Sequence, residues 1–146
     1  MWNEIANEED LLIFMKLMNF FHDSCIKELK YTSGAYVDEK LFMYPVNDQR
    51  TLKVVFQRQY EEYPMIELEF EGLKYLKLFP VDDQYTCEIF DSTLILKNNY
   101  VYWADCGEID RENIENYSGT IICASKLRWR SINGFFGKET FFNSPI

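Results

Sequence analysis

The sequence lacks most of the features that identify an enzyme or a nucleic-acid-binding protein. It has one histidine and only six glycines in 146 residues, and no phosphate-binding glycine loop, nucleophile elbow, helical zinc motif or calcium loop occurs. Fifteen lysines and arginines against 24 aspartates and glutamates give a net charge of -9. Because polyanions are bound by clustered cations, we expect no nucleic acid partner. An acidic chain favours a basic partner or simply solubility.

The sequence also lacks a long hydrophobic run and a metal-binding cysteine pattern. The apolar segment 11–21 is interrupted by Lys16 and Asn19, and it is too short to cross about 30 Å of hydrocarbon. Residues 1–10 carry four acids and no lysine or arginine, the reverse of a secretory leader. The cysteines are far apart, with no C-x-x-C pair: Cys25, Cys87, Cys106 and Cys123. We therefore expect a cytoplasmic protein with free thiols, no membrane association, no metal and no cofactor.

The N-terminal part of the sequence predicts a long helix. Asn7 can cap it, and Asp10 stands three residues later, where a capping box carries an acid. Side chains that are apolar except for His22 then recur at steps of three or four: Leu11, Met15, Met18, His22, Cys25 and Leu29. This spacing predicts a helix over about 8–30, ended by Ser33-Gly34. Additional apolar residues, such as Leu12 and Leu17, predict a helix buried on more than one side.

The rest of the chain has the alternation and the turn residues of β-strands. We predict strands at about 40–45, 51–59, 65–71, 73–79, 85–97, 100–105, 119–131 and 135–142. Turns are expected at Glu71-Gly72, at Asn98-Asn99 and, with the strongest hairpin signal, at Asn133-Gly134. A bulge or bend is expected near Asp91-Ser92, because 85–97 exceeds a usual strand. Segment 107–118 has many acids and few apolar residues, which predicts an exposed loop.

Two predicted strands carry stripes of opposite charge. In 65–71, three glutamates alternate with Ile66, Leu68 and Phe70, and in 124–130 three cations alternate with Leu127 and Trp129. The alternation predicts that the apolar residues face the core and that Glu67, Glu69 and Glu71 are exposed together. The cations of the second stripe are Lys126, Arg128 and Arg130. They would either pair with acids or form a cationic patch for an acidic ligand or partner.

These elements predict one domain, residues 1–146, of the α+β class. The long N-terminal helix would pack on a twisted antiparallel β-meander of six to eight strands, about 40–142, that is open or curled toward a barrel. A two-sheet sandwich is the alternative.

A few side chains are candidates for chemistry. His22 and Cys25 would share a helix face and could form a thiol–imidazole dyad, although the same stripe favours a buried, structural histidine. Asp91 and Asp105 lie near aromatic residues, as the paired acids of a glycosidase do, although turn or bulge roles are commoner for aspartate. The enzyme hypothesis is therefore a small hydrolase or ligand-binding enzyme that uses His22, Asp23 and Asp105.

The chain resembles small uncharacterised bacterial proteins at 21–25 (Phe-His-Asp-Ser-Cys), 102–105 (Tyr-Trp-Ala-Asp) and 127–130 (Leu-Arg-Trp-Arg). This resemblance implies no activity. In size, acidity and aromatic content the chain is also similar to immunity proteins that neutralise bacterial toxins. We expect a non-enzymatic binding or interaction protein of this type, in which the acidic loop and an aromatic surface contact another, basic protein. The predicted binding residues are Trp103, Asp105, Lys126, Arg128 and Arg130.

The C-terminal segment carries four phenylalanines: Phe135, Phe136, Phe141 and Phe142. A hairpin at Asn133-Gly134 would fold them back on strand 119–131, where they would either cover the core or present an apolar patch at a sheet edge. The second alternative predicts a homodimer or a partner contact through this segment.

Overall fold

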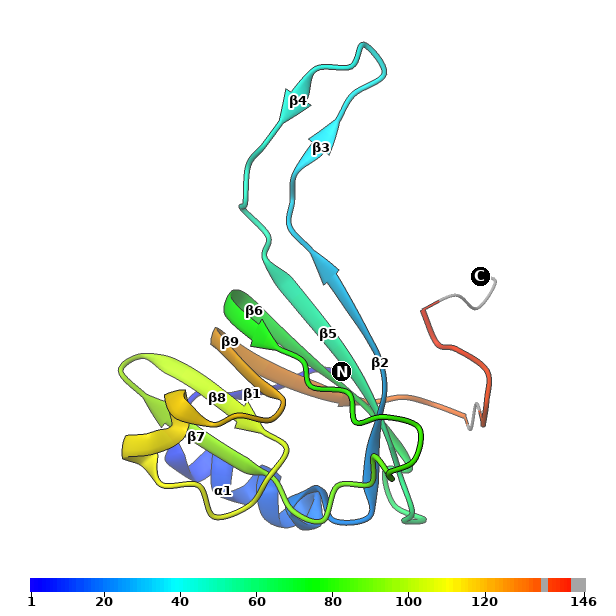
Figure 1. Cartoon of the computed structure of the whole chain (residues 1–146), viewed down its shortest axis with the longest axis vertical. Helices are drawn as coiled ribbons and strands as arrows, with labels where there is room; N and C mark the ends of the chain where they lie inside the picture. Colours follow the sequence, from blue (N-terminus) through cyan, green and yellow to red (C-terminus); the bar gives the residue numbers. More distant parts are fainter. Residues whose placement is uncertain (135–136, 143–146) are drawn as a thin grey trace.

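The computed structural model describes residues 1–134 and 137–142 and is built mainly from antiparallel strands (Figure 1). One sheet has the strand order β2-β5-β6-β9-β8-β7, and β1 pairs with β9 on the edge that β8 also uses. Its strands are β1 (Asn3–Ile5), β2 (Ser24–Thr32), β5 (Thr51–Arg58), β6 (Met65–Lys77), β7 (Thr93–Lys97), β8 (Tyr100–Ala104) and β9 (Ile121–Ser131). Two short strands, β3 (Tyr36–Val37) and β4 (Met43–Tyr44), pair separately.

The predicted α+β fold with a long helix is wrong. The helix α1 spans only Glu8–Leu17, a 3-10 turn η1 follows at Asn19–Phe21, and Ser24–Thr32 is the edge strand β2. The N-terminal cap is as predicted, since the side chain of Asn7 accepts a hydrogen bond from the backbone N–H of Asp10 at 2.8 Å. A short helix beside a large antiparallel sheet thus replaces the predicted long helix.

The helix ends because three consecutive residues adopt a left-handed backbone. Asn19, Phe20 and Phe21 have φ angles of 49°, 55° and 62°, a conformation that is rare for bulky residues. Phe21 is nevertheless fully buried, and its ring contacts those of Phe14, Phe56 and Trp103 at centroid distances of 4.9–5.7 Å. We infer that this packing compensates for the backbone strain. The turn contains no glycine from which the left-handed conformation could have been predicted.

The sheet is not a simple meander, because β9 lies between β6 and β8. Strands β5, β8 and β9 lie close to their predicted ranges, and Asn98 and Asn99 form the predicted turn with φ angles of 53° and 66°. The predicted turn at Glu71-Gly72 is wrong, because β6 continues through it. Gly72, at φ 63°, approaches Ser125 of β9 so closely that an added Cβ would lie 2.9 Å from the serine Oγ. Of predicted strand 85–97, only the part from Thr93 is in the β7–β8 hairpin.

Apolar side chains fill both faces of the sheet. The larger cluster joins α1 and η1 to the sheet and includes Phe14, Phe56, Phe70, Trp103 and Trp129. A second cluster lies between β7–β9 and the segment that contains η2 (Arg111–Asn116). Ile114 of this segment is fully buried, so the predicted acidic loop is in part a cover for the sheet.

The structure describes only part of the predicted C-terminal strand 135–142. Phe135 and Phe136 lie outside the described residues, and 137–142 contain no strand. Phe141 and Phe142 pack against a third cluster formed by Val55, Met65 and Ile132. These two phenylalanines therefore cover the sheet rather than present a separate patch.

Candidate functional site

The most prominent surface feature is a hairpin that extends beyond the sheet. Residues 33–50 connect β2 to β5, and their two-residue strands β3 and β4 pair with each other. Figure 1 shows this segment, which we call the arm, projecting from the body along the longest axis of the molecule. Its tip is organised by Asp38, whose Oδ1 accepts hydrogen bonds from the backbone N–H groups of Lys40 and Phe42 at 2.9 and 3.0 Å. The arm is thus an ordered element with an Asx-type turn at its end.

The arm exposes an unusual number of large apolar side chains. Leu41, Phe42 and Met43 at the tip are 83%, 62% and 63% exposed. The rings of Tyr36 and Tyr44 stack across the two strands at 4.7 Å, yet both remain exposed. Contiguous exposed apolar surface of this kind marks interaction sites on soluble proteins. The sequence signal was the apolar run Leu41 to Tyr44, which we interpreted only as a strand.

The two charge stripes lie side by side as β6 and β9. Their register pairs Glu67 with Arg130, Glu69 with Arg128 and Glu71 with Lys126. The core half of the prediction is confirmed, because the apolar residues of the β6 stripe are fully buried. The prediction that the glutamates are exposed together is wrong, since Glu67 and Glu69 are buried.

The predicted binding residues of β9 are largely committed to these internal contacts. Arg130 Nε lies 2.8 Å from Glu67 Oε1, and Arg128 Nη2 lies 2.7 Å from Glu69 Oε1. The guanidinium carbons of Arg128 and Arg130 lie 4.4 and 4.5 Å from the centroid of the Trp2 ring. The strand pairing explains why a stripe of three cations forms little free cationic surface.

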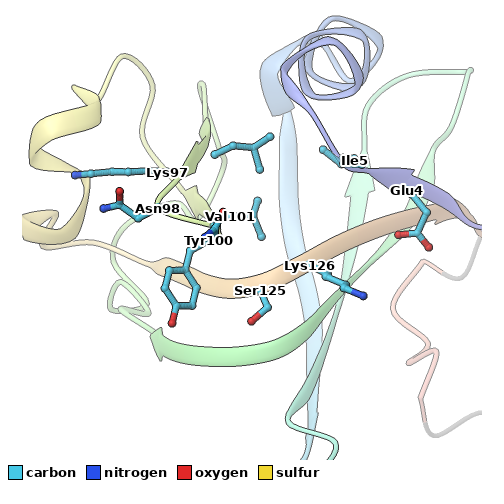
Figure 2. A pocket seen from close by; sticks show the side chains of 11 residues that line it. Glu4, Ile5, Lys97, Asn98, Tyr100, Val101, Ser125 and Lys126 are labelled. Atoms are coloured by element: carbon cyan, nitrogen blue, oxygen red, sulfur yellow. The ribbon is translucent and has the colours of Figure 1, made fainter.

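Lys126 is exposed and borders the notch in Figure 2, which has a volume of about 550 Å³. The notch lies where β1 ends and the β7–β8 hairpin begins along β9. Glu4, Lys97 and Lys126 bring both charge signs to it, and Lys97 already pairs with Glu115 at 2.8 Å. No sequence motif predicts this notch.

Trp103 and Asp105, the other predicted binding residues, are separated by their environments. Trp103 is fully buried and contacts Phe21 and Phe56. Asp105 accepts a hydrogen bond from the hydroxyl of Tyr117. The pKa of Tyr117 is raised, first by burial and then by this bond. Both residues thus contribute to internal structure.

His22 is not buried in a helix stripe as predicted, because its side chain is 44% exposed. Its Nδ1 lies 2.6 Å from the carbonyl oxygen of Phe90, and its Nε2 lies 3.4 Å from Asp23 Oδ2. The hydrogen bond to Phe90 is the main cause that raises the pKa of His22. Desolvation, the next largest effect, lowers this pKa, and the charges of Asp23, Asp91 and Glu88 raise it further. The predicted dyad on one helix face does not form, since Cys25 lies in β2.

The structure brings His22 and Asp23 together but places Asp105 elsewhere. Asp23 borders a cavity of about 740 Å³ that is also lined by Cys25 and Cys87, whereas Asp105 borders a different one of about 330 Å³. Within residues 1–134 and 137–142, no group of three histidine, cysteine or acidic side chains is arranged to hold a metal ion. No helix in that part of the chain is long and apolar enough to span a membrane.

Comparisons with known proteins add no relative. No protein-family model, no curated protein and no solved structure matches this chain. The function must therefore be inferred from the surfaces of the molecule.

Proposed function

We propose that this chain is a non-enzymatic protein-binding protein whose arm inserts into an apolar cleft of a basic partner protein. The observation that carries the proposal is the exposure of Leu41, Phe42 and Met43 on an ordered hairpin that projects from the sheet. An isolated two-stranded hairpin is marginally stable in water. Burial of the arm in a partner would supply the apolar contacts that its own body does not.

Charge supports the choice of a basic partner. The net charge of -9 attracts a cationic protein over several ångströms and raises its association rate. The arm itself carries three acids and two cations, so this attraction comes from the chain as a whole: Asp38, Glu39, Asp48, Lys40 and Arg50. All four cysteines are free thiols, which supports a cytoplasmic location as part of the same proposal.

We do not propose that the chain is a hydrolase that uses His22, Asp23 and Asp105. Neither of the two cavities that border Asp23 and Asp105 contains all three residues of the enzyme hypothesis. Asp105 is also engaged by Tyr117. Binding through the arm does not require these three side chains to meet in one cavity.

The test begins with a photo-crosslinking amino acid at Phe42, introduced into the full chain in its native cells. The crosslinked protein is identified, purified separately and titrated against the wild-type chain by calorimetry. Replacing Leu41 and Phe42 by serine should weaken binding at least about tenfold, because buried apolar anchors dominate interface energies.

The matched control replaces Leu78 and Phe79 by serine, since these are 50% and 61% exposed on the body of the protein. It should bind the partner as the wild type does, and urea melts should show that both variants remain folded. An arm variant that binds like the wild type would refute the proposal. A crosslink to a second copy of the chain would instead indicate self-association through the arm and overturn the basic partner. If the partner is a toxin, as for an immunity protein, the wild type should inhibit it and the arm variant should not.

A further inference from the structure

Helix α1 exposes apolar side chains on the face that a surface helix normally makes polar. Leu11, Phe14 and Met15 are buried in the main core. Leu12 and Ile13 on the other side are 48% and 60% exposed. A helix packed against a core on one side ordinarily carries polar residues on the opposite side. The extra apolar residues predict a helix buried on several sides, but no segment of the described residues covers that surface.

A groove runs along this helix. It has a volume of about 380 Å³ and lies between α1 and the two segments 91–94 and 107–108. Its apolar lining comes from both sides: Leu11, Leu12, Met15, Phe20 and Leu94. Phe20, held in its left-handed conformation, is 42% exposed beside it. The strained turn that ends α1 therefore also presents an aromatic ring to the groove.

The charged groups at this groove are all acidic. Asp91 and Glu108 line it, and no lysine or arginine does so among the described residues. Both are exposed, and neither carboxylate makes a hydrogen bond or salt bridge to another described residue. Glu8 and Glu9 in the first turn of α1 add negative charge nearby, although Glu8 lies 3.7 Å from Arg111. Lys16, in the last turn, is the cation of this helix.

We propose that this groove binds a cationic amphipathic helix of a partner protein. The apolar residues of such a helix, spaced by three or four, would contact Leu12 and Phe20, and its lysines or arginines would pair with Asp91 and Glu108. On α1 the lining residues Leu11, Leu12 and Met15 span about one turn, so the groove would contact about one to two turns of the bound helix. Figure 1 shows α1 and the arm at opposite ends of the molecule. This surface is therefore independent of the one in the proposed function.

The test titrates the full chain with a 14-residue peptide of leucine and lysine, Leu-Lys-Lys-Leu-Leu-Lys-Leu-Leu-Lys-Lys-Leu-Leu-Lys-Leu, whose leucines follow helical spacing. A second peptide of the same composition, Leu-Lys-Leu-Lys-Leu-Lys-Leu-Leu-Lys-Leu-Lys-Leu-Lys-Leu, has no single apolar helix face. Fluorescence anisotropy should show binding of the first peptide at micromolar concentration and at least about fivefold weaker binding of the second. In a chain with labelled methyl groups, the resonances of Leu12 and Leu94 should shift.

Charge variants separate a specific groove from general attraction to an acidic protein. The variant Asp91→Asn with Glu108→Gln should weaken binding of the first peptide about fivefold or more. The control, Asp83→Asn with Glu61→Gln, makes the same change of net charge at two exposed acids away from the groove and should change binding less than about twofold, because distant exposed charges are screened. Leu12→Ser should also weaken binding, whereas Val37→Ser, at a residue of equal exposure on the arm, should not.

Equal losses in the groove and control charge variants would overturn the proposal, since attraction would then follow net charge alone. Equal binding of the two peptides, or no binding at 100 µM, would overturn it as well. The urea midpoint of each variant should equal that of the wild type within error, which shows that a change in peptide binding does not result from unfolding. The double serine variant of the arm should bind the peptide normally, so failure here and failure of the arm proposal are distinguishable.

Discussion

Replacing Arg130 by methionine should destabilise the protein strongly, because it leaves the carboxylate of Glu67 buried without its cation. The side chain of Glu67 is 1% exposed, and its Oε1 lies 2.8 Å from Arg130 Nε. Its Oε2 has no hydrogen-bond partner among the described residues. Removing one member of a buried ion pair costs about 3–5 kcal/mol. The side chain of Arg130 is 35% exposed, so water can reach part of the vacated site, and we expect a loss near the lower limit.

The reverse change should cost less. Replacing Glu67 by leucine leaves Arg130 without its carboxylate, but the guanidinium is partly hydrated and also lies 4.5 Å from the ring of Trp2. We expect a loss of about 1 kcal/mol. The double variant removes both charges and should unfold within about 1 kcal/mol of the wild type, because apolar replacements of a buried pair are often neutral.

Urea unfolding of the four proteins gives the coupling energy of the pair directly. Arg111→Met is the control, since Arg111 lies 3.7 Å from Glu8 with both side chains more than half exposed, and it should change stability by less than about 0.5 kcal/mol. A loss of less than about 1 kcal/mol for Arg130→Met, similar to this control, would refute the conclusion that the ion pairs between β6 and β9 form a buried network.

Two further outcomes follow from burial and charge. Phe70→Ala should cost about 3–5 kcal/mol in urea melts, because Phe70 is fully buried in the main core; a loss below about 1 kcal/mol would mean that β6 has a different register. The pKa of His22, measured by proton NMR titration, should lie above 6.5, chiefly because of the Phe90 carbonyl. The stability that protonated His22 contributes should be complete below pH 6.5 and be lost as pH rises through the raised pKa. His22→Gln should remove this pH dependence, and an unchanged profile would contradict it.

Several local features of the fold could be predicted from the sequence because they depend on neighbouring residues. The alternation in 65–71 predicted that Ile66, Leu68 and Phe70 face the core, and all three are fully buried. The Asn98-Asn99 pair predicted a tight turn, since asparagine tolerates the left-handed conformation that both residues adopt. The cap at Asn7 was predicted for a similar reason, because its hydrogen bond to Asp10 spans three residues. Each signal is complete within a few residues of chain.

Contacts between distant residues decided where α1 ends. The stripe from Leu11 to Leu29 continues at helical spacing, so the sequence carries no stop signal before Ser33-Gly34. Phe21 is buried against Phe56 and Trp103, 35 and 82 positions later in the chain, and this packing stabilises a backbone turn that local propensity disfavours. Pairing with β5 then makes Ser24–Thr32 a strand, with a bulge between Ile26 and Glu28 that obscures its alternation.

The candidate surfaces were decided in the same way. The sequence presented Glu67 and Glu69 as solvated residues and Arg128 and Arg130 as a binding patch. Only the adjacency of β6 and β9, about 60 residues apart in the chain, turned them into a buried ladder. The arm and the α1 groove are surfaces because nothing in the described fold covers their apolar residues. A sequence specifies which side chains are apolar, but whether another segment buries them depends on the tertiary arrangement of the whole chain.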